Sequence, residues 1–135
     1  MSDSVLDSIA GQLESLGYQI TKDQEKELFR ARHQRQPNLR VREFGGGILF
    51  TIVFYGNDAA KSDEPAFLRC IIALNRKAVV ARFYSNHDPN NLALFIEVWH
   101  PNLYQKAAFG KFFEALQRDI RLLGDDDIKI MSYLA

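Results

Sequence analysis

The fold is decided first by residues 39–55, LRVREFGGGILFTIVFY, in which two extended runs flank three consecutive glycines. Glycine readily adopts the positive φ values that tight turns require, so the pattern predicts a β-hairpin with its turn at Gly45, Gly46 and Gly47. In the second run, residues 48–55, both alternating sets of side chains are mainly apolar. This predicts a central strand that is covered on both faces.

Three glycines also occur in phosphate-binding loops, where they follow a strand and precede a helix, so that the helix N-terminus faces the anion. Here the glycines precede a run rich in Ile, Val and Phe that has the character of a strand. The hairpin turn is therefore the favoured interpretation.

An amphipathic helix is predicted before the hairpin, over about Val5 to Leu16. Ser4 stands at the N-cap position, apolar residues repeat at three and four along the segment, and Gly17 follows it. This is the order of signals that a capped helix shows.

The next segment, Thr21 to Gln34, is charged throughout and has few apolar residues. Thr21 and Gln24 are spaced as a capping box, which predicts a short exposed helix. A strand over Glu27 to His33 is the alternative, because short patterns do not separate the helical period from the strand period well.

After the hairpin, Gly56 to Asp63 is polar and shows no periodicity. Asp63 and Pro65 then precede an apolar spacing typical of a helix that ends at residues 75–77. A strand over Phe67 to Leu74 is the alternative. The helix is favoured because the first turn of a helix tolerates Pro65.

The last third predicts a second hairpin and a long helix. The strands Ala78 to Tyr84 and Leu92 to Trp99 are joined by turn-forming residues 85–91. Pro101 and Asn102 open the helix, in which large apolar residues repeat at three and four until a glycine at position 124. The short apolar tail from Ile128 to Leu134 is expected to add a terminal strand.

Together these elements predict a single α+β domain over residues 1–135. The predicted order is α-β-β-α-β-β-α, with a mainly antiparallel sheet packed by helices. A chain of 135 residues is long enough to bury one hydrophobic core.

Composition predicts a soluble, cytoplasmic protein without a membrane segment. The 17 basic and 17 acidic residues cancel, so no general attraction to nucleic acid or anionic membrane is expected. The longest apolar run has eight residues, whereas a membrane-spanning helix needs about 20. The only cysteine, Cys70, excludes an intramolecular disulfide and is expected to be buried and inert. A secretory leader is not expected, because the first residues lack a basic stretch followed by an apolar run.

Catalytic residues, metal ligands and cofactors are not predicted. His33, His87 and His100 stand singly, with no ligand spacing between them. His87 and Asp88 lie in a loop of turn formers, where solvated turn chemistry is the common explanation. An enzyme would have to gather His87, Asp88, His100 and Arg82 from distant segments, and their spacing does not require it.

Residues 30–42 contain five arginines and one histidine but no acidic residue. Such a segment could contact nucleic acid phosphates in a salt-dependent manner. The zero net charge and the absence of interleaved aromatic residues argue against nucleic acid, so a solvated surface or one that faces an acidic protein is favoured. Arg30, Arg32 and Arg35 are therefore candidate partner-binding residues.

Trp99 and His100 are further candidates for partner binding. They precede Pro101 at a junction between a strand and a helix, where an aromatic residue can be a lid on the core or an exposed anchor for a partner. The sequence alone leaves both readings open.

Four features of the second half resemble the YbjN family of bacterial sensory-transduction regulators, over about Glu64 to Leu123. They are Leu74-Asn75-Arg76-Lys77, Val80-Ala81-Arg82-Phe83-Tyr84, the apolar strand from Leu92 to Val98, and the aromatic helix after Asn102. The resemblance implies a type III secretion chaperone-like fold and a non-enzymatic module that binds another protein, often as a homodimer. The resemblance also implies an early strand where the charged segment Thr21 to Gln34 stands, and the predicted helix departs from it.

The sequence thus leads to a non-catalytic protein-binding adaptor or chaperone-like regulator of unknown partner, without a cofactor. The alternative is a small-molecule sensor. Its apolar ligand would lie on a sheet face that bears Phe50, Phe83 and Phe95.

Overall fold

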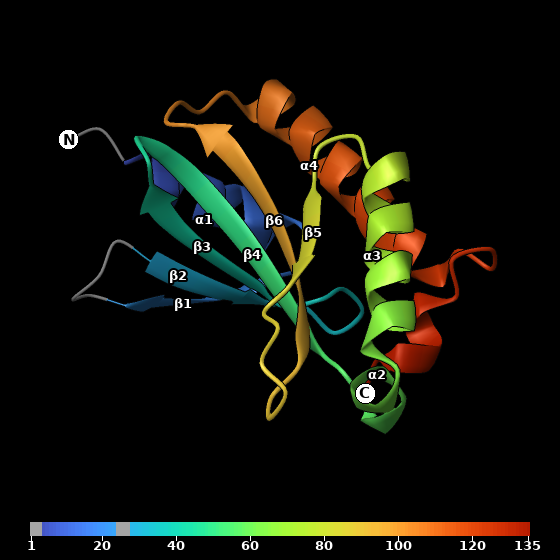
Figure 1. Cartoon of the computed structure of the whole chain (residues 1–135). Coiled ribbons are helices and arrows are strands. Elements are labelled where there is room, and N and C mark those ends of the chain that lie inside the picture. Colours follow the sequence, from blue (N-terminus) through green and yellow to red (C-terminus); the bar gives the residue numbers. More distant parts are fainter. Residues whose placement is uncertain (1–3, 24–27) are drawn as a thin grey trace. The chain divides into compact units, whose positions relative to one another are not determined.

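The computed structural model describes residues 4–23 and 28–135, which form an α+β fold (Figure 1). Its helices are α1 (Val5–Ser15), α2 (Asp58–Ser62), α3 (Glu64–Lys77) and α4 (Lys106–Arg121), with the 3-10 helices η1 (Leu122–Gly124) and η2 (Ile130–Tyr133). Its strands are β1 (Gln19–Asp23), β2 (Leu28–Arg32), β3 (Leu39–Phe44), β4 (Gly47–Tyr55), β5 (Arg82–Ser85) and β6 (Ala93–Pro101).

The strands hydrogen-bond in the order β1-β2-β3-β4-β6-β5. The pairs β1–β2, β2–β3, β3–β4 and β5–β6 are antiparallel. The predicted α+β class with a mainly antiparallel sheet is confirmed. The order of elements differs from the predicted α-β-β-α-β-β-α, because residues 19–23 and 28–32 form two further strands and residues 58–62 form a further helix. The type III secretion chaperone-like character of the fold stays a prediction.

The chain divides into two compact units. Unit 1 comprises Met1–Ile52 and Val98–Phe112, and unit 2 comprises Val53–Glu97 and Phe113–Ala135. Strands β4 and β6 and helix α4 contribute residues to both units. The expectation of a single domain stays a prediction.

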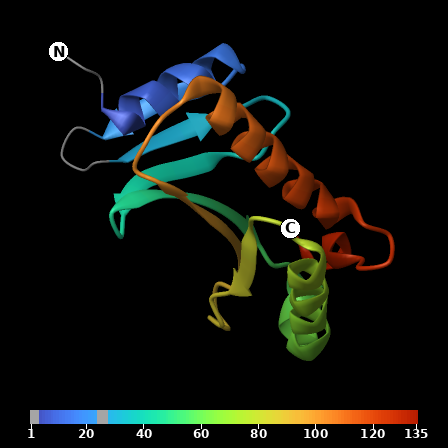
Figure 2. The same cartoon turned by 90° about the horizontal axis from the view of Figure 1, so that it is seen from above.

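Unit 1 packs α1 along one face of strands β1 to β3 (Figure 2). The Ser4 side chain accepts the backbone N–H of Asp7 at 3.1 Å and caps the helix, and Gly17, with φ of 97°, lets the chain turn back after it. Leu13, on the inner face of α1, is fully buried. The helix predicted from Val5 is confirmed to within one residue at its end.

Strands β3 and β4 form the predicted hairpin. Gly45 and Gly46 have φ values of 60° and 76°, which the turn requires. Gly47 serves a different purpose, because a Cβ atom there would overlap the indole of Trp99 and lie 2.6 Å from the backbone oxygen of His100. The third glycine is needed for the close approach of β6.

The prediction that both faces of residues 48–55 are covered holds only for the first part of β4. Residues 48–50 are buried, whereas Val53 and Tyr55 are 38% and 56% exposed. The β3–β4 ladder ends at the pair Arg40–Thr51. Beyond this pair β4 has lost β3 as a neighbour, and its outer side chains lose the contacts that β3 provided.

The predicted helix over Thr21 to Gln34 is wrong, and the alternative strand is correct in its described part. Residues 19–23 and 28–32 form β1 and β2, while Gln24 and Glu27 lie outside the described residues. Phe29 and Ala31 are buried and their neighbours Arg30 and Arg32 are exposed. This period of two suits a strand that buries one face against α1.

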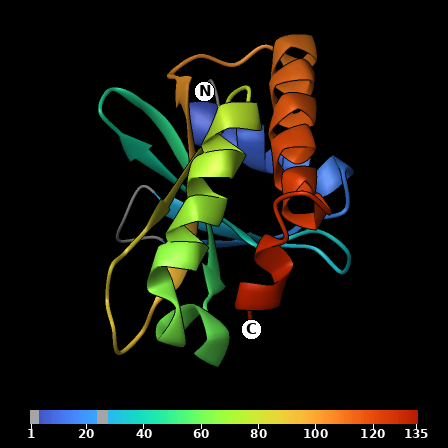
Figure 3. The ribbon, with the colours of Figure 1, turned by 45° about the vertical axis from the view of Figure 1, so that its right-hand side comes forward.

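Unit 2 contains α3, which lies beside the C-terminal part of the chain (Figure 3). Asp63 accepts the N–H of Ala66 at 3.2 Å, and Pro65 occupies the first turn. Phe67 and Leu74 on the inner face of the helix are fully buried. The predicted helix is confirmed, and the alternative strand is excluded.

The second hairpin is confirmed with a shorter first strand, because β5 starts at Arg82 and not at residue 78. The carboxylate of Asp119 on α4 is 1% exposed. It accepts the backbone N–H groups of Val79, Val80 and Ala81 at 2.8 to 3.0 Å. These N–H groups therefore bind the carboxylate and do not extend a strand ladder.

The long helix was predicted to open at Pro101 and Asn102, but Pro101 ends β6 and α4 begins at Lys106. The Gln105 side chain accepts the N–H of Ala108 at 2.6 Å and so serves the first turn.

The chain end differs from the predicted strand over residues 128–134. Asn57 caps α2, which lies in the segment without periodicity, by accepting the N–H of Ala60 at 3.1 Å. Its Nδ2 donates to the carbonyl oxygens of Ser132 at 2.9 Å and Leu134 at 3.3 Å. The tail consequently forms η2, and only Leu134 makes a β-bridge, to Gly56.

Candidate functional site

The face of strands β1 to β4 opposite α1 in unit 1 carries a regular array of side chains. Residues that lie opposite each other in paired strands share a face, so the register defines the rows of this array. From one end to the other, the rows are Phe44 and Gly47; Asp23, Leu28, Arg42 and Leu49; Thr21, Arg30, Arg40 and Thr51; and Gln19 with Arg32. We call Arg30, Arg32, Arg40 and Arg42 together the arginine face.

No ion pair within the described part of the chain neutralises the positive charge of the arginine face. Arg30, Arg32 and Arg40 are exposed, and Arg42 is half-buried. Within residues 4–23 and 28–135, none of the four forms an ion pair or donates a side-chain hydrogen bond. Arg30 lies directly opposite Arg40, a placement that puts the Cβ atoms of two like charges about 5 Å apart.

Two exposed aromatic rings stand at one end of the arginine face. Phe44 is 54% and Trp99 is 47% exposed, and the indole Nε1 of Trp99 donates to the backbone oxygen of Phe44 at 2.9 Å. The Arg42 guanidinium lies 4.9 Å from the centre of the Phe44 ring, within the range of a cation–π interaction. We call Phe44 and Trp99 the aromatic corner, whose geometry Gly47 permits.

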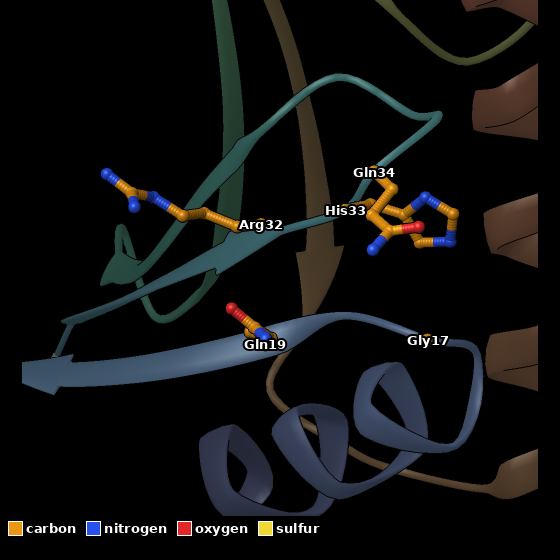
Figure 4. A pocket seen from close by; sticks show the side chains of 5 residues that line it. All are labelled: Gly17, Gln19, Arg32, His33 and Gln34. Atoms are coloured by element: carbon orange, nitrogen blue, oxygen red, sulfur yellow. The ribbon is translucent and has the colours of Figure 1, made fainter.

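A polar hollow of about 420 Å³ marks the other end, where β1 leaves α1 and β2 ends (Figure 4). It is lined by Gly17, Gln19, Arg32, His33 and Gln34. Figure 4 shows the Arg32 side chain extending away from the His33 ring. The lining contains no carboxylate, so the two ends of the arginine face differ: one is aromatic and the other is polar.

His33 supports the bend beside this hollow. Its Nδ1 accepts the backbone N–H groups of Arg35 at 2.9 Å and Gln36 at 3.2 Å. An accepting Nδ1 places the proton of the neutral ring on Nε2. The ring also lies 4.8 Å from that of Tyr18. His33 therefore has a structural role in the described chain.

The candidate partner-binding residues divide in the structure. Arg30 and Arg32 belong to the arginine face, and Trp99 belongs to the aromatic corner at its end. Arg35 lies in the bend after β2 and is exposed beyond the face.

His100 is the candidate that does not reach the surface. The residue is only 8% exposed, and its ring packs edge-on against Phe112 with the ring centres 4.7 Å apart. Its Nδ1 lies 2.8 Å from the backbone oxygen of Pro101. The open question about the Trp99-His100 junction thus has two answers: Trp99 is exposed and His100 belongs to the core of unit 1.

The other residues of the hypothetical enzyme have local structural partners in unit 2. Arg82 pairs with Glu97 at 2.7 Å. His87, with φ of 54°, has its Nδ1 3.3 Å from a carboxylate oxygen of Glu64. Asp88 accepts the N–H of Asn90 at 3.0 Å within the turn.

Cys70 is half-buried and donates to the backbone oxygen of Ile128 at 3.2 Å. Burial raises the pKa of its thiol, and the charge of Arg69 lowers that pKa by less. A raised pKa disfavours the thiolate form that a nucleophile needs.

The three phenylalanines of the sensor hypothesis do not share one open surface. Phe50 is 1% exposed and packs against Phe112 in unit 1. In unit 2, Phe83 is buried, while Phe95 pairs with Tyr84 on the opposite face and stacks on its ring at 5.3 Å. Side chains already fill the space that an apolar ligand would need beside Phe50 and Phe83.

Within the described ranges, no three His, Cys, Asp or Glu side chains gather closely enough to hold a metal ion. None of the helices in those ranges has the length and apolar character to cross a membrane.

Asn75 explains why two short motifs of the sequence occur together. Its side-chain Nδ2 donates to the backbone oxygen of Phe83 at 2.8 Å, and its Oδ1 accepts the N–H of Phe83 at 2.9 Å. The amide thus occupies the outer edge of β5 as a neighbouring strand would. Leu74-Asn75 and Arg82-Phe83, which carried the YbjN resemblance, are in contact through this pair.

The sequence placed Arg40 and Arg42 in the arginine-rich segment 30–42 but did not select them as partner-binding candidates. Phe44 was not identified as a member of this surface. The signal was present as alternation in β3, where these three residues lie at every second position. It became informative only once β2 was known to be a strand paired with β3.

No family model and no curated protein matches the sequence. Among solved structures, the chain is similar to YbjN from E. coli, described as a candidate transcription regulator. The TM-score is 0.72 at 15% identity, over 99% of each chain. It is also similar to an uncharacterised protein from Methanothermobacter thermautotrophicus, with a TM-score of 0.63 at 11% identity over 94% of each chain. The resemblance to YbjN that the sequence predicted is therefore confirmed at the level of the fold.

Proposed function

We propose that this protein is a non-catalytic adaptor or regulator that binds an acidic segment of another protein on its arginine face. The observation that carries the proposal is the Arg30–Arg40 pair. Two exposed like charges lie opposite each other on adjacent strands, with no acidic partner in the described chain.

Such a pair lowers the stability of the free protein, because like charges in directly opposed positions repel. A carboxylate bound between the two guanidinium groups would remove this repulsion. Arginine is suited to the task, since its planar fork can donate two parallel hydrogen bonds to one carboxylate. The energetic cost in the free state thus becomes a gain in the complex.

A regulatory role is also supported by the likeness to YbjN, whose description as a candidate transcription regulator concerns that protein. Nucleic acid is the competing ligand for any arginine surface. It is disfavoured by the zero net charge of the whole chain, which supplies none of the long-range attraction typical of nucleic-acid-binding domains.

The test is a titration of the full chain with a fluorescein-labelled hexaglutamate peptide and, separately, with a single-stranded DNA oligonucleotide. Binding of the peptide is expected to weaken at least tenfold in the double variant Arg30→Glu/Arg40→Glu. The matched control Arg69→Glu/Lys111→Glu changes the net charge equally at exposed helical positions and is expected to bind normally.

Equal losses in both double variants would mean that net charge alone governs binding, and the proposal would fail. Tighter binding of the oligonucleotide than of the peptide would replace the acidic protein with nucleic acid as the ligand.

A further inference from the structure

We infer that the partner segment is an extended chain with an apolar side chain at one end and acidic side chains at the following alternate positions. The apolar side chain docks on the aromatic corner, and the acidic side chains reach Arg42 and Arg40. This inference rests on the proposed function and adds to it the pattern that the surface selects.

The aromatic corner is arranged in advance for contact. Trp99 is tethered by its hydrogen bond to the Phe44 backbone oxygen, and the missing side chain at Gly47 lets the indole lie against β4. Both residues still expose about half of their surface. Tryptophan and arginine are the residues most often found at the energetic centre of protein interfaces, and a rigid ring loses little conformational entropy on binding.

Spacing follows from strand geometry. Phe44, Arg42 and Arg40 are alternate residues on one face of β3, so their side chains are about 7 Å apart along the strand. An extended peptide repeats at the same interval at every second residue. An apolar residue above Phe44 therefore places residues two and four positions away above Arg42 and Arg40.

The polarity of the surface determines where the apolar residue of the partner segment can bind. Among the described residues of unit 1, the exposed aromatic side chains are Phe44 and Trp99, at one end of the arginine face. The opposite end opens into the polar hollow beside Gln19 and Gln34. The middle of the face is occupied by guanidinium groups, which would be desolvated without compensation under an apolar side chain. The apolar residue is therefore expected at the end of the acidic segment.

The experiment compares two labelled peptides of identical composition. In one, Leu-Ser-Glu-Ser-Glu, the leucine is terminal; in the other, Glu-Ser-Leu-Ser-Glu, it is central. The terminal-leucine peptide is expected to bind at least tenfold more tightly to the full chain. Because Trp99 is the only tryptophan, its intrinsic fluorescence is expected to change with the terminal-leucine peptide and less with the other.

Protein variants locate the preference. Phe44→Ser should reduce the ratio of the two affinities to near one. The control Leu103→Ser removes an apolar side chain of similar exposure, 56%, that belongs to the same unit and lies outside the arginine face, and it should keep the ratio.

Equal binding of both peptides, with loss of both in Arg30→Glu/Arg40→Glu, would overturn the inference and leave the proposed function intact. Failure of both peptides and of hexaglutamate to bind would overturn both. A preference for terminal leucine that survives Phe44→Ser would place the apolar contact elsewhere and refute the role of the aromatic corner.

Discussion

Arg30 and Arg82 are both exposed arginines on strands, yet their cross-strand neighbours are opposite in charge. In unit 2, Arg82 lies opposite Glu97, pairs with it at 2.7 Å and stacks over Tyr84. In unit 1, Arg30 lies opposite Arg40. The charges of unit 2 stabilise the local structure, whereas those of the arginine face oppose one another. This difference is the observation on which the proposal of a binding role for the arginine face rests.

The largest expected effect on stability follows from removal of the buried carboxylate in unit 2. Asp119→Ala would leave the N–H groups of Val79, Val80 and Ala81 without their acceptor. We expect a loss of about 3 kcal/mol or more in the free energy of unfolding, measured by urea denaturation. Asp119→Asn keeps one acceptor oxygen and should lose less. A neutral effect of Asp119→Ala would show that this charge does not organise unit 2.

The next largest loss of stability is expected in unit 1, where the aromatic corner depends on Gly47. Gly47→Val would force the indole of Trp99 away from β4, at a cost of about 2 kcal/mol from overpacking, and would shift the tryptophan fluorescence. Gly11→Ala is the control, because a Cβ atom at that position of α1 meets nothing within 4 Å. It should stabilise the protein by up to about 1 kcal/mol. An unchanged spectrum in Gly47→Val would contradict the described packing.

A smaller loss is expected where unit 2 protects the edge of its sheet. Asn75→Ala removes both hydrogen bonds to the backbone of Phe83. We expect the unfolding free energy to fall by about 1.5 kcal/mol. Asn75→Asp keeps the acceptor but places a second oxygen against the backbone oxygen of Phe83, so we expect it to lose at least as much stability as Asn75→Ala. Full stability of Asn75→Ala would mean that water replaces the amide without loss.

The contrast between Arg30 and Arg82 is tested directly by replacing each with glutamate. The two changes in unfolding free energy are expected to be small and opposite in sign. Arg30→Glu places a carboxylate opposite Arg40 and should stabilise the protein by about 0.5 kcal/mol. Arg82→Glu places it opposite Glu97 and should destabilise by a similar amount. Urea midpoints of the two variants measure the difference. If both variants destabilise equally, the like-charge pair carries no strain and the main support for the binding face is lost.

The smallest effect concerns acid stability in unit 2. The hydrogen bond from Lys77, at 2.8 Å, and those from the backbone hold the pKa of Asp125 below its ordinary value of 3.8. The ionised form thus stabilises the fold above that value, and the stabilisation is lost as pH falls through the lowered pKa. Lys77→Met should make the unfolding midpoint less dependent on pH below about 4. An identical acid profile in the variant would exclude this contribution.

Element types were largely predictable where a local signal agreed with burial. The caps at Ser4 and Asp63 and the glycine turn at 45–46 needed no information from distant residues. The segment 21–34 was misassigned because its burial pattern is only five residues long in β2 and depends on pairing with β3. The candidate site was predictable in composition, as an arginine-rich stretch, but not in membership.

By itself the sequence determined the amphipathic helices and the hairpin over residues 39–55. It also determined a net charge of zero, which gives no general attraction to nucleic acid or anionic membrane. These are properties of neighbours along the chain, and local propensities and caps encode them. Only the tertiary structure decided that Arg30 lies opposite Arg40 and that the indole of Trp99 packs against Gly47. It also decided that the carboxylate of Asp119 binds the N–H groups before β5, so that the strand starts at Arg82. Each of these depends on strand register or on a contact between segments distant in sequence, which no local pattern specifies.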